Sequence, residues 1–81
     1  MRIIAEIPNP DCKISVFYMN QKYIVKFEKG NLEQSYKISE IDFIISGIDD
    51  IKKVINESLI TSVLLRFQQM QQDMQTALKD F

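Results

Sequence analysis

Apolar and polar residues alternate over most of the first 38 positions, which predicts β-strands. Residues 2–7 form a short apolar run that ends at two prolines, and proline cannot donate to a strand ladder. Residues 12–19 and 23–28 alternate again, and residues 32–38 complete the set. The first half of the chain therefore predicts four strands.

A two-residue loop at Asn20 and Gln21 fixes which residues of the second and third strands lie opposite one another. The resulting pairs test the strand prediction. One face of the pair becomes apolar throughout, while the other mixes apolar side chains with lysines. A second turn, at residues 30–31, extends the apolar face but sets Glu28 against Glu33. The predicted partners are Tyr18 with Tyr23, Val16 with Val25, Ile14 with Phe27, Phe17 with Ile24, Val25 with Tyr36, and Tyr23 with Ile38.

Residues 48–81 carry apolar side chains at steps of three and four, which predicts one long helix. Ile60, Leu64 and Leu65 extend its apolar surface most of the way round. At 1.5 Å per residue such a helix is roughly 50 Å long, too long for one small sheet to cover. We therefore expect a second copy of the helix to cover the rest, with a kink near Thr61 as the alternative. The predicted dimer interface is Leu59, Ile60, Val63, Leu64, Phe67 and Met70.

The intervening residues 39–47 are predicted as a connector. Ser39 and Asp42 stand at capping-box spacing, so this segment is either a short helical turn or an apolar strap over the sheet. The whole chain, residues 1–81, is then one α+β domain. Its fold class is a four-stranded antiparallel meander (residues 1–38) followed by a long C-terminal helix (residues 48–81), forming a helix-mediated dimer.

Composition restricts the chemistry. The chain has no histidine, one cysteine and two glycines, which argues against a catalytic triad, a structural zinc site and a glycine-rich nucleotide loop. We expect no cofactor, no metal and no enzymatic activity, and an enzyme ranks third among the functions considered. Cys12 shares strand parity with the apolar set, so it is interpreted as a small core residue. The first residues become charged too early for a signal peptide, and no run reaches transmembrane length, so a cytoplasmic protein is expected.

Net charge is −1, with a mildly basic sheet half and an acidic helix half, which is unlike a duplex-DNA binder. The outer face of the predicted sheet nevertheless places aromatic and apolar side chains among lysines, an arrangement that can hold single-stranded nucleic acid. The same apolar patch could hold a protein partner, and lysines are also ordinary protection for a sheet. The candidate binding face is Phe17, Met19, Lys22, Ile24, Lys26 and Lys37.

Residues 3–14, 22–28 and 32–38 resemble a small family of uncharacterised proteins of Bacteroidetes bacteria, a resemblance that implies no activity and no site. The order of four strands and a long helix is similar to the Whirly and coactivator p15 type of domain. That second resemblance implies dimerisation through the helix and single-strand binding on the sheet, although no motif matches residue by residue and the acidic balance differs. The expected function is a non-enzymatic binding or scaffold module acting as a homodimer. A single-stranded nucleic-acid-binding protein is the alternative.

Overall fold

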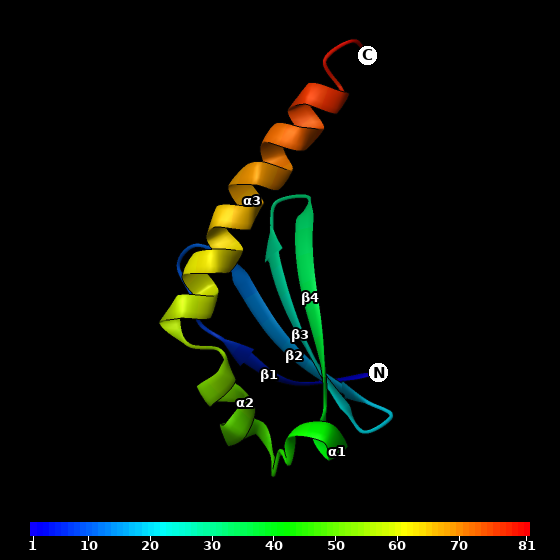
Figure 1. The fold of residues 1–81 in the computed structure, drawn as a ribbon, viewed down its shortest axis with the longest axis vertical. Helices are drawn as coiled ribbons and strands as arrows, with labels where there is room; N and C mark the ends of the chain where they lie inside the picture. Colours follow the sequence, from blue (N-terminus) through cyan, green and yellow to red (C-terminus); the bar gives the residue numbers. More distant parts are fainter.

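Four antiparallel strands form one sheet in the order in which they occur along the chain (Figure 1). The computed structural model describes all of residues 1–81. The predicted fold class, an α+β domain with a four-stranded meander and a long C-terminal helix, is confirmed. The strands are β1 (Arg2–Ile7), β2 (Lys13–Met19), β3 (Lys22–Lys29) and β4 (Leu32–Ser39), and the helices are α1 (Glu40–Phe43), α2 (Ile48–Val54) and α3 (Glu57–Ala77).

The turn residues fix the β2–β3 register. Asn20 and Gln21 both have positive φ, 52° and 60°, as a type I′ turn requires, and the twist of that turn matches the twist of the flanking strands. Tyr18 consequently lies opposite Tyr23, and every partner predicted for these two strands is confirmed.

The β3–β4 register is also confirmed, including the pair of like charges at Glu28 and Glu33. Gly30 has a φ of 59° in the turn, a conformation that glycine adopts without steric cost. Lys26 lies on the same face, and its Nζ is 3.1 Å from Glu33 Oε2. This cation offsets the repulsion that the register creates.

The predicted continuous helix over residues 48–81 is wrong at Ile55 and Asn56, which separate α2 from α3. Ile55 has ψ 71°, outside the helical region, and Asn56 is extended. The Asn56 side chain accepts a hydrogen bond from the Leu59 amide at 2.9 Å, so it caps a new helix. Thr61 lies inside the unbroken α3, which ends at Ala77 rather than at Phe81.

The break lets a short helix, α2, and a long helix, α3, both pack against the core, which one straight helix could not do. In Figure 1, α2 and α3 run in different directions. Ile51 from α2, Ile55 from the break and Val63 from α3 all reach the same core as a result. The buried core side chains are Cys12, Ile14, Val16, Tyr23, Val25, Phe27, Ile51, Ile55, Val63 and Phe67.

The connector contains the predicted helical turn. Ser39 Oγ accepts a hydrogen bond from the Asp42 amide at 3.4 Å and caps α1. Beyond α1, Ile45 packs against the core, so the second half of the connector also lies over the sheet. At the other end of the molecule, α3 continues past the β3–β4 turn (Figure 1), and the chain extends 48 Å along its longest axis.

Candidate functional site

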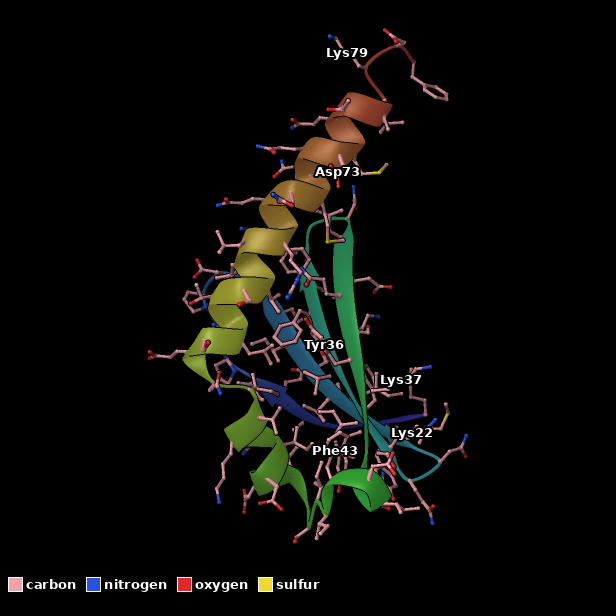
Figure 2. All side chains as sticks on the ribbon, in the orientation of Figure 1. Lys22, Tyr36, Lys37, Phe43, Asp73 and Lys79 are labelled. Atoms are coloured by element: carbon pink, nitrogen blue, oxygen red, sulfur yellow. The ribbon has the colours of Figure 1, made fainter.

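The six residues of the candidate binding face lie together on the outer side of the sheet. Phe17 pairs with Ile24, Ile24 with Lys37, and Met19 with Lys22 across neighbouring strands. Lys22 and Lys37 are exposed and lie at the same end of the sheet (Figure 2). Two cations therefore flank the apolar residues at this end.

The rest of that face is less suited to nucleic acid than the sequence suggests. Lys26 is bound to Glu33, whose hydrogen bond is the main cause that raises the pKa of Lys26 above its usual value. Ile24 is buried and Phe17 is half-buried, so neither presents a free stacking surface. Lys22 and Lys37 are the only lysines of the six that remain free of an ion pair.

The predicted dimer interface on the helix is largely used within the protomer. Val63 and Phe67 are 0% and 2% exposed and belong to the protomer's own core, so they offer no surface to a second copy. The other four residues, Leu59, Ile60, Leu64 and Met70, are partly buried against that core. The sheet, divided helix and connector together cover most of the surface for which a second helix is expected.

An apolar groove that the sequence analysis missed lies between β4 and the segment joining α1 to α2. It measures about 630 Å³, and eight of its ten lining residues are hydrophobic. The sheet contributes Val25, Tyr36 and Ile38, and the helices contribute Val54 and Leu59. The remaining lining residues are Lys37, Phe43, Ile44, Ile45 and Asp50.

Two side chains of the connector project from this groove into solvent. Phe43, the last residue of α1, is 68% exposed and lies at the end of the sheet (Figure 2), and Ile44 is 87% exposed. The amide of Ser46 donates to Asp50 Oδ2 at 2.8 Å, which ties the connector to α2. The groove is therefore apolar inside, has one cation and one carboxylate among its lining residues, and has a wall fixed by hydrogen bonding.

Ile44 occupies a backbone conformation that isoleucine rarely adopts. Its φ and ψ are 51° and 56°, in the left-handed region, where a β-branched side chain is strained. Its amide donates to the carbonyl of Glu40 and so ends α1. A glycine would satisfy this position more easily. Strained residues cluster at functional sites, so Ile44 is a candidate contact residue of the groove.

Hydrogen bonds hold the sheet end of the groove in place. Tyr18 donates from its hydroxyl to Glu40 Oε1 at 2.6 Å, and this bond is the main cause that raises the pKa of Tyr18. Arg66 of α3 donates to the Tyr36 hydroxyl at 2.9 Å, and Gln34 Nε2 donates to the Val63 carbonyl at 2.9 Å. One bond is donated by α3 and the other by β4, so the strand that forms one wall of the groove is anchored to the helix.

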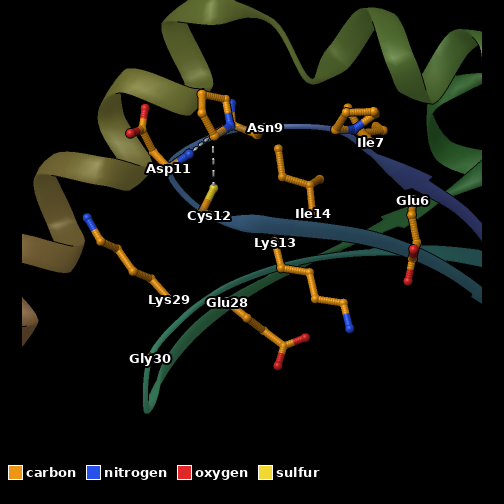
Figure 3. A pocket seen from close by; sticks show the side chains of 12 residues that line it. Glu6, Ile7, Asn9, Asp11, Cys12, Lys13, Ile14, Glu28, Lys29 and Gly30 are labelled. Carbon is orange, nitrogen blue, oxygen red and sulfur yellow. Dashed lines mark hydrogen bonds between the residues drawn. The ribbon is translucent and has the colours of Figure 1, made fainter.

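Cys12 lies beside a second, more polar hollow near the β1–β2 turn (Figure 3). Asn9 Oδ1 accepts a hydrogen bond from the Asp11 amide at 2.8 Å and one from the Cys12 thiol at 3.9 Å. Burial is the main cause that raises the pKa of the Cys12 thiol, which keeps it protonated and unreactive near neutral pH. The interpretation of Cys12 as a core residue is confirmed.

Comparison with protein-family models, with curated proteins and with solved structures finds no match for the chain. The two resemblances described from the sequence therefore stay predictions. None of the helices is both long enough and apolar enough to cross a membrane. The cytoplasmic location also stays a prediction.

Proposed function

We propose that the chain is a non-enzymatic protein-binding module that acts as a homodimer and binds an amphipathic segment of its partner in the apolar groove. The observation that carries the proposal is the groove itself, with eight hydrophobic residues among ten and the exposed Phe43 and Ile44 at its side. An amphipathic helix binds such a groove by placing its apolar side chains inside and its polar side chains at the rim.

The charges at the groove define the complementary ligand further. Lys37 and Asp50 are the only charged residues that line it, and the side chain of Lys37 belongs to the opposite face of β4 from Tyr36 and Ile38. A segment with an apolar stripe and one basic residue at its edge would pair with Asp50, whereas a strongly acidic segment would be repelled by it. The expected partner is therefore a nearly neutral amphipathic segment.

A titration followed residue by residue tests this proposal. We expect a short, neutral, leucine-rich helical peptide to shift the amide NMR signals of groove residues, and a scrambled peptide of the same composition to leave them unchanged. Val54→Ser should weaken binding by up to about tenfold, because full burial of an aliphatic side chain is worth about 1.5–3 kcal/mol and Val54, 43% exposed, has about half of that left to gain. Leu65→Ser is the matched control, since Leu65 is exposed but does not line the groove.

Equal losses from the two serine variants would place binding elsewhere on the protein. The absence of any shift at groove residues with millimolar peptide would refute the proposal for this class of segment. Neither variant should unfold the protein, because Val54 and Leu65 are both exposed in the protomer.

Single-stranded nucleic acid is the second candidate, favoured by the free Lys22 and Lys37 beside Phe17 and Met19. Fluorescence anisotropy of a labelled oligonucleotide at about 50 and 200 mM salt tests it, because phosphate contacts weaken steeply with salt. Lys22→Glu should then reduce the affinity more than Lys26→Glu, since Lys26 is already occupied by Glu33. Absence of binding at the lower salt concentration would exclude this candidate.

A further inference from the structure

The outer edge of β4 presents backbone amides and carbonyls that have no partner strand, and the pairing with β3 shows which residues they belong to. The amide of Glu40 donates to the carbonyl of Gln21 at 3.1 Å, immediately beyond the β3–β4 pairs. Hydrogen-bonded and non-hydrogen-bonded pairs alternate in an antiparallel ladder, so the even-numbered residues of β4 bond to β3. The amides and carbonyls of Glu33, Ser35 and Lys37 therefore point away from the sheet.

The two edges of the sheet differ in their protection. β1 has a shift in register between Ile3 and Ala5 and is followed by Pro8, features that hinder pairing with another strand. β4 (Leu32–Ser39) pairs with β3 without any shift and contains no proline. β4 has β3 as its only neighbour in the sheet, and its residues Glu33, Ser35 and Lys37 are all exposed. β4 is thus the edge at which another strand can add.

We propose that β4 pairs antiparallel with β4 of a second copy about a two-fold axis at Ser35. This axis places Ser35 opposite Ser35 of the partner subunit, and Glu33 opposite the partner's Lys37 on both sides. All three pairs use outward-pointing amides and carbonyls, so they are hydrogen-bonded pairs. The two charge pairs are opposite in sign, and on the other face Leu32 meets the partner's Ile38.

The register about Ser35 is therefore complementary on both faces of the extended sheet. A shift of the axis by one residue, to Gln34 or Tyr36, would place Glu33 opposite the partner's Ser35 or the partner's Ser39 and would remove both charge pairs. Glu33 also keeps its contact with Lys26, because its side chain is more than half exposed and has two oxygens. Each carboxylate would then lie between two cations.

The same axis relates the groove to the projecting end of α3. Antiparallel pairing places the Leu32 end of one β4 beside the Ile38 end of the other. α3 extends past the Leu32 end with Met74 and Leu78 exposed, whereas the groove lies at the Ile38 end. The second copy would thus bring apolar helix surface towards the groove and complete its open side. Only this role of the second copy in completing the groove rests on the proposed function, and the β4 pairing does not.

Light scattering and a proline variant test the pairing. We expect the protein at about 100 µM to have twice the protomer mass of 9.5 kDa. Ser35→Pro should shift it to monomer while the far-UV circular dichroism spectrum is retained, because proline is tolerated on an edge strand where its nitrogen faces outward. A monomeric wild-type protein, or a folded Ser35→Pro protein that remains dimeric, would overturn the proposal.

A charge exchange tests the register. Lys37→Glu places two like-charge pairs across the axis and should raise the dimer dissociation constant about tenfold or more. Adding Glu33→Lys restores opposite charges at both pairs and should recover most of the affinity. A double variant no tighter than Lys37→Glu alone would exclude this register.

Cysteine cross-linking separates this surface from the helix. In a Cys12→Ala background, Ser35→Cys should form an intermolecular disulfide under mild oxidation, because the paired Cα atoms lie about 5.5 Å apart, within disulfide range. Ser58→Cys is the matched control, an exposed serine in the first turn of α3. Preferential cross-linking of Ser58→Cys would overturn the proposal.

The groove is assessed separately from the pairing. Peptide titration of monomeric Ser35→Pro reports whether the groove still binds when the pairing is lost. A wild-type protein that is monomeric but still shows peptide shifts at the groove would overturn the β4 pairing alone. A wild-type dimer that Ser35→Pro dissociates, with no peptide shifts in either protein, would overturn the groove alone.

Discussion

Replacing Ile44 with glycine should make the protein more stable, although it removes a large apolar side chain. The left-handed backbone of a non-glycine residue costs about 1–2 kcal/mol, which glycine does not incur. Glycine also adds flexibility to the unfolded chain, and this offsets about 0.4–1 kcal/mol of the stability gained by relieving the strain. Ile44 is 87% exposed, so little buried apolar surface is lost. The net expectation is a gain of about 0.5–1 kcal/mol, or a rise in Tm of about 2–8 °C.

Thermal unfolding followed by circular dichroism, at one fixed protein concentration, measures the change. Ile41→Gly is the matched control, because Ile41 is also exposed but lies in the right-handed turn of α1, where glycine should cost up to about 1 kcal/mol. The same substitution three residues apart should therefore have opposite signs. A fall in Tm for Ile44→Gly as large as that for Ile41→Gly would refute the strain argument. If the groove binds its peptide as proposed, Ile44→Gly should also weaken that binding while it raises Tm.

Three further perturbations test other parts of the structure. Asn56→Ala should lower the free energy of unfolding in urea by about 1 kcal/mol and Asn56→Gly by only a few tenths, and equal losses would exclude a capping role for the side chain. Phe67→Ala should cost about 3–5 kcal/mol in the same assay, against less than about 1 kcal/mol for the exposed Leu65→Ala, and similar costs would contradict the burial of Phe67. The raised pKa of Tyr18 means that the fold favours its protonated hydroxyl, so this contribution is constant near neutral pH and is lost as pH rises through the folded pKa above 10. Tyr18→Phe should reduce that alkaline loss of stability in urea midpoints measured against pH, and an unchanged profile would contradict the role of the bond to Glu40.

The sheet could be predicted from sequence because local chemistry sets its registers. A two-residue turn leaves one pairing for all following residues, and the alternation of side chains then assigns each to a face. The pairs on both sides of β3 follow from Asn20, Gln21 and Gly30 alone. No long-range information is needed for this part of the fold.

The break before α3 was not predictable from periodicity, because the apolar stripe passes through it unchanged. Ile51, Ile55 and Leu59 are spaced four apart and all contact the core despite the interruption. The sequence signal for a helix start at this position is Asn56, a preferred capping residue, followed by the acidic Glu57 in the first turn. Periodicity reports which residues are buried, and it does not report whether the backbone between them is continuous.

The groove lies beyond the reach of this kind of sequence analysis for a related reason. Its lining comes from β3, β4, the connector, α2 and α3, and the connector that carries Phe43 and Ile44 has neither helical nor strand periodicity. The only sequence signal is a run of apolar residues in a segment with no assigned role. Only the tertiary arrangement shows that these side chains remain exposed instead of entering the core.

The position of the charges distinguishes the two surfaces through which the chain could dimerise. A helix-mediated dimer places no requirement on β4, so the charges of that strand could then be of any sign and at any spacing. In the structure Glu33 and Lys37 are equidistant from Ser35, share one face and are opposite in sign, as a two-fold axis at Ser35 requires. The helix meanwhile has Val63 and Phe67 already buried in its own protomer. The apolar helix that first suggests a dimer is thus largely covered without one, and the strand edge is the surface whose chemistry matches a second copy.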